Sequence, residues 1–446
     1  MKTVTPKAVD DWLVKNKADI FKDLRALVRI PSVSDASSLV KPFGQPCRDA
    51  INFMCELGKK RGYATQNFEN YVGAIEFSKG DKTVGIWAHL DVVPVDDASA
   101  WSCPPFDLTV LNDKYLVGRG VNDNKMPAIA VFYVFNCLRD LGVKLKHGYT
   151  LYMGTSEETG MEDARWFRDN CACPDLSLVP DCGFPVCIAQ RGACSIEISV
   201  PVSFDGKITQ GNNPSVTAEE VEAYVDGETL QTSGQSAHIF ALDGKVNADI
   251  ELLKALKLRF PADSEALDAL LKLCGDTYGC GLNMAYCDAK SGALRMALTK
   301  LSLNNGYLTA GVRAIIPVTM DIDKALEAAK KACEALGMEF KLTSLRKPVS
   351  FPEDNPVIPV LCSAYNEVVA SDAKPYVMSG GNYAAYIPNA IGFGPGMPRT
   401  LPEELFKNGR GDYHQVDECD DFDHIFAFIR IYVNAIIALE ELNDFK

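Results

Sequence analysis

A small set of separated positions carries side chains that can bind a divalent metal ion. They are His89, Asp123, Glu157, Glu158, Asp181 and His414. Short apolar runs at residues 84–88, 149–153 and 176–180 lead into His89, the Glu157–Glu158 pair and Asp181. Such runs, bounded by turn residues, are typical of buried strands, and open α/β sheets bind ligands just outside the carboxyl ends of their strands. The spacing therefore predicts a site at one edge of a sheet.

Each of these residues also has an ordinary structural explanation. A buried histidine is often only hydrogen-bonded, and Asp123 lies where the N-cap of a helix would be. Glu157 and Glu158 could be a solvated loop pair, and the remaining positions could be turn or loop residues. Asp91 favours the metal hypothesis for His89, because a ligating imidazole usually donates its second N–H to a carboxylate or carbonyl.

Taken together, the two histidines and the carboxylates suit a pair of Zn²⁺ ions. Two metals about 3.5–4 Å apart need a bridging carboxylate and a bridging water that acts as nucleophile. A further carboxylate must take the proton of that water. Adjacent glutamates can divide this work, one as a ligand and one as the general base.

The overall composition is that of an acidic globular protein. The chain has 446 residues, 47% of them hydrophobic and 23% charged, and a net charge of −14. Its length predicts two or three domains, and its charge argues against nucleic acid or an anionic membrane as a partner. We see no apolar run of about 18 residues and expect no membrane span. The 15 cysteines lack paired C-x-x-C spacing, which favours free thiols in a cytoplasmic protein.

The pattern of elements divides the chain. Strand-like and helix-like segments alternate over 1–190 and again over 348–446, which predicts one discontinuous α/β domain with a mostly parallel sheet and helices on both faces. Residues 191–347 contain period-two alternation at 195–200, typical of antiparallel strands, and predict an inserted α+β domain. Helices are expected at 1–28, 124–141, 218–224, 248–258, 264–274, 324–336, 356–370 and 422–442.

Ordered motifs give this pattern a specific resemblance. They are HLDVVP at 89–94, GRGVND at 118–123, SEETG at 156–160, VPD at 179–181 and YHQVDE at 413–418. The chain resembles the aminoacylase, glutamate carboxypeptidase and dipeptidase family of co-catalytic zinc peptidases, and within it the peptidase V type. The resemblance covers nearly the whole chain. It implies a catalytic domain at 1–190 and 348–446, interrupted by a ferredoxin-like lid domain at 191–347.

The resemblance also implies roles for individual residues. Asp123 would bridge two Zn²⁺ ions per chain, for which Mn²⁺ or Co²⁺ could substitute. The implied metal ligands are His89, Asp123, Glu158, Asp181 and His414. The implied catalytic residues are Glu157 as general base, Asp91 as the group that orients His89, and His238, in GQSAH at 234–238, as a stabiliser of the oxyanion.

Substrate contacts are implied in two places. Arg313, in Gly311-Val312-Arg313, resembles an arginine that grips the substrate carboxylate, a task suited to a bidentate guanidinium. The glycine-rich segment at 379–385 would contribute Gly380, Gly381 and Asn382. That segment lacks the Thr and Arg usual in the dipeptidase branch, which leaves recognition of the substrate's C-terminus open.

The predicted function is hydrolysis of dipeptides or short peptides with a free N-terminus, by a metal-bridging water with Glu157 as base. The long insertion implies a monomer that supplies His238 from the same chain. An N-acyl amino acid deacylase or a carboxypeptidase with the same dizinc site is the nearest alternative. A catalytically silent peptide-binding or metal-binding protein is a different class, and the complete set of metal positions argues against it. A cysteine hydrolase is disfavoured because no Cys has an evident His/Asn arrangement.

Overall fold

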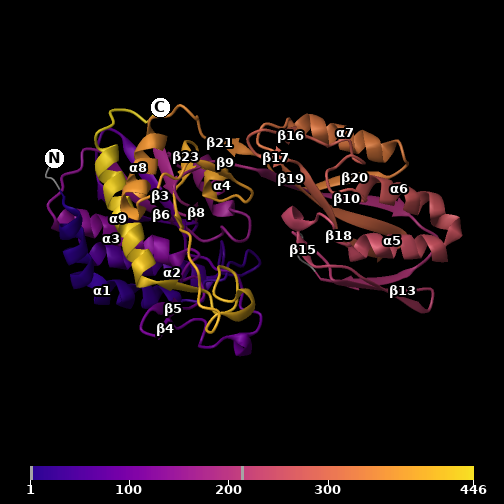
Figure 1. Ribbon diagram of the computed structural model, residues 1–446, viewed down its shortest axis with the longest axis horizontal. Helices are drawn as coiled ribbons and strands as arrows, with labels where there is room; N and C mark the ends of the chain where they lie inside the picture. Colours follow the sequence, from indigo (N-terminus) through magenta and orange to yellow (C-terminus); the bar gives the residue numbers. More distant parts are fainter. Residues whose placement is uncertain (1–3, 212–214, 446) are drawn as a thin grey trace. The chain divides into compact units, whose positions relative to one another are not determined.

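The computed structural model describes residues 4–211 and 215–445, which separate into two compact units (Figure 1). The first unit comprises Met1–Ile188, Phe351–Tyr376 and Asn382–Lys446. The second comprises Ala189–Ser350 and Val377–Gly381, so it is inserted into the sequence of the first. The roles expected for the two parts, catalytic domain and lid, stay predictions.

The first unit is built on a large mixed sheet. Its strand order is β1 (Ala64–Phe68), β2 (Val72–Ser78), β6 (Gly148–Gly154), β3 (Thr83–His89), β7 (Leu176–Val179), β23 (Ala390–Gly392) and β9 (Cys187–Gln190). The strands from β6 to β23 are parallel, whereas β1, β2 and β9 pair antiparallel with their neighbours. The expectation of a mostly parallel sheet is therefore wrong at the edges. Residues 69–71 between β1 and β2 are too few for the crossover that parallel strands need.

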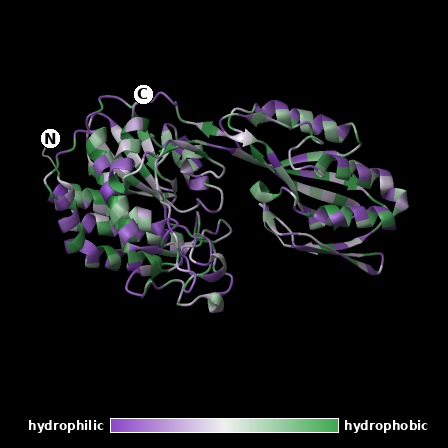
Figure 2. Cartoon of the chain, in the orientation of Figure 1, coloured by the Kyte–Doolittle hydropathy of each residue, from purple (hydrophilic) through white to green (hydrophobic). Residues whose placement is uncertain are grey.

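Helices cover both faces of this sheet. One face is covered by α1 (Pro6–Val28), α2 (Gln45–Lys60), α3 (Lys125–Asp140), α8 (Val357–Val369) and α9 (Phe422–Leu439), and the other by α4 (Glu162–Asn170) and the short helix η4 (Tyr383–Ala385). Alternation along β3 explains this: Ile86 and Ala88 pack with the first group, and Trp87 packs with the second. The helices carry hydrophobic and hydrophilic residues together, as helices with one buried face do (Figure 2).

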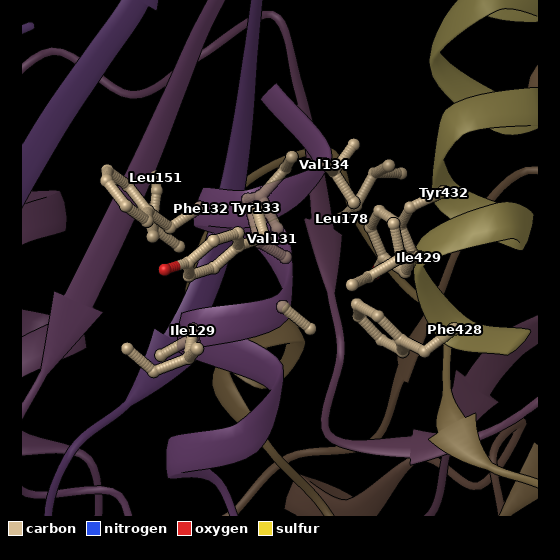
Figure 3. Packing of buried hydrophobic residues seen from close by; sticks show 14 of the residues in the cluster. Ile129, Val131, Phe132, Tyr133, Val134, Leu151, Leu178, Phe428, Ile429 and Tyr432 are labelled. Atoms are coloured by element: carbon tan, nitrogen blue, oxygen red, sulfur yellow. The ribbon is translucent and has the colours of Figure 1, made fainter. Parts of the chain in front are cut away.

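Within the described residues, α9 is long and apolar enough to cross a membrane by length and composition. This helix includes Asp423 and Arg430, so it is not an unbroken apolar run. Half of that window is buried inside the protein, and Phe428, Ile429 and Tyr432 lie in the same core as Val134 of α3 and Leu178 of β7 (Figure 3). Burial of such side chains contributes about 1.5–3 kcal/mol each. Core packing therefore accounts for the apolar composition of α9.

The second unit contains an antiparallel sheet in the order β18 (Arg295–Asn304), β19 (Tyr307–Ile316), β10 (Gly192–Pro201) and β20 (Glu339–Arg346). Its apolar face packs against α5 (Ala248–Arg259), α6 (Ser264–Cys274) and α7 (Ile322–Glu334). The period-two pattern of β10 places Ile196, Ile198 and Val200 on that face. β21 (Val349–Ser350) pairs with residues 189–190 of β9.

The helix expected at 218–224 is wrong. That segment contains β13 (Glu220–Val225), which lies between β11 (Gly206–Gln210) and β14 (Glu228–Ser233). Buried and exposed residues alternate strictly along β13, and Asp226 and Gly227, both at positive φ, turn the chain into β14. Two residues with positive φ are what a tight hairpin requires. The hairpin turn thus outweighs the helical propensity of the segment.

Shorter elements complete the two units. In the first, β4 (Thr109–Leu111), β5 (Tyr115–Val117) and β25 (Cys419–Asp421) form a small sheet, β8 (Cys182–Gly183) pairs with β24 (Pro395–Gly396), and η1 (Ala98–Ala100) and η5 (Lys407–Gly409) are single turns. In the second, β12 (Val216–Thr217) pairs with β15 (Ala237–His238), β16 (Cys287–Asp288) pairs with β17 (Gly292–Ala293), and η2 (Ile239–Ala241) and η3 (Pro261–Asp263) are single turns. β22 (Tyr376–Met378) pairs with β9.

Candidate metal centre

Three parallel neighbours of the large sheet end at the residues singled out in the sequence. His89 is the last residue of β3, the Glu157–Glu158 pair follows β6, and Asp181 follows β7. β3 pairs in parallel with both β6 and β7, so their carboxyl ends lie at the same edge of the sheet. The strand-end placement expected from the apolar runs is confirmed.

Asp123 lies between the two imidazoles. Its Oδ1 is 2.9 Å from Nε2 of His89, and its Oδ2 is 3.0 Å from Nε2 of His414. The same His414 nitrogen is 2.8 Å from Oε1 of Glu158, and His89 Nε2 is 3.9 Å from Oδ1 of Asp181. One carboxylate facing two separate nitrogen donors is the arrangement that a bridging ligand needs.

Ligand atoms gather in two overlapping groups in which all atoms lie within 4.8 Å of one another. The first group is His89, Asp123 and Glu158, and the second is His89, Glu157 and Asp181. Several carboxylates brought together in a largely buried place repel one another, and burying such charges is costly unless a cation offsets them. Imidazole and carboxylate donors fit Zn²⁺ and the related divalent ions. The residues present therefore fit a metal centre.

Burial and mutual charge perturb these groups. Burial opposes the charged form of His89, yet the hydrogen bond to Asp123 holds the pKa of His89 well above its ordinary value. Burial likewise opposes the charge of His414, but Asp123 and Glu158 raise the pKa of His414 to about 10. Burial raises the pKa of Asp181 to about 7, and Asp123 adds to the rise. An imidazole must lose its proton to bind a metal, so metal binding would release protons from this cluster.

Asp91 connects the histidine to the glutamate pair. Asp91 is fully buried. Nδ1 of His89 lies 3.0 Å from the backbone carbonyl oxygen of Asp91 and 3.4 Å from Oδ1 of Asp91. Its two carboxylate oxygens accept the backbone N–H groups of Glu157 and Glu158, each at 3.1 Å. Asp91 can therefore fix both the orientation of the imidazole and the turn that carries the two glutamates.

The N-cap explanation for Asp123 is wrong. Helix α3 begins at Lys125, and Asn124 occupies the N-cap position without a side-chain cap. Asn124 is instead used across the site: its Oδ1 accepts the backbone N–H of His89 at 3.3 Å, and its Nδ2 donates to the carbonyl of Pro180 at 2.6 Å. The side chain of Asp123 is thereby left to face the imidazoles.

Sequence reasoning missed Glu418 as a residue that shapes the site. Glu418 is fully buried and accepts backbone N–H groups of Gly120 at 3.1 Å, Asn122 at 2.9 Å and Asp123 at 3.1 Å. It also forms a buried ion pair with Arg119 at 2.8 Å. The only signal was its place in the YHQVDE motif, which does not indicate that Glu418 contacts the loop at 118–123.

Asn382 and the two glycines before it lie in different units. Asn382 is buried in the first unit, and its Nδ2 donates to the carbonyl of Asp181 at 2.7 Å. Gly380 and Gly381 belong to the second unit, where a Cβ on Gly381 would lie 2.0 Å from the Arg346 guanidinium. Their contact with substrate stays a prediction.

His238 and Arg313 belong to the second unit, whereas the candidate metal ligands belong to the first. His238 is exposed at the end of β15, and its ring stacks on Phe240 with centroids 5.3 Å apart. Partial burial lowers the pKa of His238, which favours the neutral imidazole. Arg313 Nη1 donates to the hydroxyls of Ser195 at 2.9 Å and Ser344 at 3.3 Å. The roles of both residues stay predictions.

The sequence matches a known protein family over most of its length. The sequence profile described as Peptidase family M20/M25/M40 matches residues 85–438. The chain is 26% identical to "Putative dipeptidase YtjP" of Bacillus subtilis (strain 168) over an alignment of 471 positions, which covers 96% of this chain and 98% of that protein. It is 25% identical to "Putative dipeptidase SH1171" of Staphylococcus haemolyticus, over 95% of this chain and 97% of that protein.

Solved structures share the fold at low sequence identity. Human carnosine dipeptidase 1 matches with a TM-score of 0.66 at 13% identity, covering 98% of this chain and 99% of that one. The dipeptidase Dug1p from Saccharomyces cerevisiae matches with a TM-score of 0.65 at 14% identity, with the same coverage of 98% and 99%. At such identities the likeness concerns the fold, and it extends over nearly the full length of both chains.

Proposed function

Because the chain belongs to peptidase family M20/M25/M40 and is therefore a metallopeptidase, we propose that it cleaves dipeptides or short peptides with a free amino terminus. The observation that carries the proposal is Asp123, whose two oxygens face His89 and His414 at the carboxyl edge of the sheet. The relatives named as dipeptidases support the substrate class.

We infer a centre of two Zn²⁺ ions, for which Mn²⁺ or Co²⁺ could substitute. Asp123 would bridge them, with His89 and Asp181 on one side and Glu158 and His414 on the other. When bound, such a pair polarises the scissile carbonyl and makes a water molecule acidic enough to act as nucleophile near neutral pH. The short distances among these donors support the assignment.

Glu157 is the proposed general base. Its backbone is held by Asp91, and burial together with the neighbouring Asp181 raises the pKa of Glu157 well above its ordinary value. A carboxylate with a raised pKa can take a proton from water and later give it to the leaving amine. His238 would stabilise the oxyanion and Arg313 would hold the substrate carboxylate. We propose that the same chain supplies both residues to its own metal centre, in a monomeric enzyme.

The test combines metal analysis with a substrate panel. Purified protein would be loaded with Zn²⁺, Mn²⁺ or Co²⁺, analysed for metal content, and assayed against dipeptides, tripeptides and N-acetyl amino acids. We expect about two metals per chain and hydrolysis of peptides that have a free amino group. Hydrolysis of only the acetylated compounds would replace the dipeptidase by a deacylase. Less than one metal per chain would overturn the two-metal centre.

A further inference from the structure

The glycine-rich segment at 379–385 enters the first unit at two buried residues. Tyr383 is 1% exposed, and its hydroxyl donates to Oδ2 of Asp163 at 2.6 Å. The same carboxylate oxygen accepts the backbone N–H of Thr155 at 2.6 Å and of Ser156 at 2.8 Å. Tyr383 therefore contacts, through one carboxylate, the turn that leads directly from β6 into Glu157.

The protein leaves space for this contact at Gly154, the last residue of β6. A Cβ on Gly154 would lie 2.0 Å from the Tyr383 hydroxyl and 2.2 Å from Oδ2 of Asp163. Gly154 is paired with His89 on the neighbouring strand, and its carbonyl accepts the N–H of Leu90 at 2.8 Å. A glycine at this position thus allows the hydroxyl and the carboxylate to meet beside the strand residue that pairs with His89.

The neighbouring Asn382 reaches the other ligand-bearing turn. Its Nδ2 donates to the carbonyl of Asp181 at 2.7 Å, and its Oδ1 accepts the N–H of Ala384 at 3.0 Å. The Tyr383 ring also lies edge-on to the His89 ring, with centroids 6.4 Å apart. Two consecutive residues therefore contact the structures that carry His89, Asp181 and, through Asp163, the glutamate pair.

We propose that Asn382 and Tyr383 are positioning residues of the metal centre, with Asp163 as the group through which the Tyr383 hydroxyl sets the Glu157–Glu158 turn. The inference rests on the proposed function, and it changes the role expected for this end of the glycine-rich segment. Asn382 would hold the backbone of Asp181 through its hydrogen bond to the Asp181 carbonyl, instead of contacting substrate. Both residues are buried. Asn382 bonds to the backbone of Asp181, and Tyr383 bonds through Asp163 to the backbone before Glu157. Hydrogen-bonding partners of this kind control the geometry of metal ligands.

Tyr383→Phe isolates the hydroxyl, because the ring and its packing against Trp87 and His89 are kept. Tyr386→Phe is the matched control, since the Tyr386 hydroxyl has no hydrogen bond to any residue that the structure describes and its ring lies under Arg165. Metal affinity would be measured by competition with a chromogenic chelator, using Zn²⁺ alone. We expect Tyr383→Phe to weaken it about 10- to 100-fold, as loss of partners of metal ligands does, and Tyr386→Phe to leave it unchanged.

Two further readouts separate positioning from general stability and from substrate contact. Hydrogen exchange should speed up in Tyr383→Phe within a peptide covering 154–160 and stay unchanged elsewhere. With dipeptide substrate and saturating metal, kcat should fall while KM is kept. A raised KM with wild-type metal affinity would overturn the inference in favour of substrate contact, and faster exchange throughout the first unit would overturn it in favour of a general structural role.

The outcome is distinguishable from failure of the proposed function. Wild-type protein is titrated with Zn²⁺ in the same experiment. If it binds two ions and Tyr383→Phe binds them equally well, the positioning role is wrong and the metal centre stands. If wild-type protein binds no Zn²⁺, the proposed function and the positioning role are both wrong.

Discussion

Asp249, on helix α5 of the second unit, is a buried carboxyl whose charge the fold does not offset. Its side chain is 0% exposed, among residues of the apolar core such as Leu252 and Leu253. Neither carboxyl oxygen has a well-formed hydrogen bond among the described residues, although Gln210 lies close enough to lower the pKa somewhat. Burial is the larger effect and raises the pKa of Asp249 from an ordinary 3.8 to about 7.

The sign of the pH dependence follows from which form the fold prefers. The folded chain favours the protonated carboxyl, so the stabilisation is fully present below pH 3.8 and is lost as the pH rises to about 7. The whole shift corresponds to about 4 kcal/mol, at 1.36 kcal/mol for each unit of pKa. Between pH 5 and pH 8 the free energy of unfolding is expected to fall by about 2–3 kcal/mol. The rest of the stabilisation is already lost between pH 3.8 and pH 5, where the carboxyl ionises in the unfolded chain.

Asp249→Asn removes the charge at nearly constant shape. We expect the free energy of unfolding of the variant, relative to wild type, to grow by about 2–3 kcal/mol from pH 5 to pH 8 and then to level off. Comparing pH values cancels any constant effect of burying the amide. Glu265→Gln, at an exposed position of α6, is the control and should show no such growth.

The assay must report on the second unit. All four tryptophans, Trp12, Trp87, Trp101 and Trp166, belong to the first unit, so their fluorescence follows that unit and serves as an internal control. Hydrogen exchange of peptides from α5, measured in mild denaturant, gives the opening free energy of the second unit. A difference between variant and wild type that stays constant from pH 5 to pH 8 would refute the reasoning.

Three other predictions concern the first unit. Glu157→Gln should lower kcat by about 10²- to 10⁴-fold with metal content unchanged. The control Glu162→Gln, at an exposed position, should have no effect on kcat. A metal-replete Glu157→Gln variant with the turnover of wild type would contradict the base role. Glu418→Gln leaves the Arg119 guanidinium buried without its carboxylate partner and should destabilise the first unit by about 3–5 kcal/mol. Urea unfolding followed by tryptophan fluorescence measures this loss. A urea midpoint equal to that of wild type would contradict the prediction. Zn²⁺ added to metal-free protein at pH 7 should release protons, which a pH indicator detects. The reason is that the pKa of His414 is raised to about 10, so its imidazole carries a proton at pH 7 that it must lose to bind a metal. No proton release would contradict the ligand role of His414.

The sequence by itself indicated the candidate donors and their placement at strand ends. Apolar runs of local sequence encode β3, β6 and β7, and a parallel sheet brings their carboxyl ends to one edge. Residues that closely follow such runs can therefore be proposed as site candidates without knowledge of the rest of the fold. Local pattern was insufficient at β13, where a helical composition was overruled by a hairpin turn.

Only the tertiary structure decided how the donors face one another and what holds them. Asp123 faces His414, which lies nearly three hundred residues away in the chain, and Glu418 reaches the loop of Asp123 across 295 residues. Tyr383 and Asp163 are separated by 220 residues. These contacts depend on which strands neighbour which and on space left by single residues such as Gly154. Neither is encoded in local periodicity, because side chains distant in sequence come into contact only when the whole core packs.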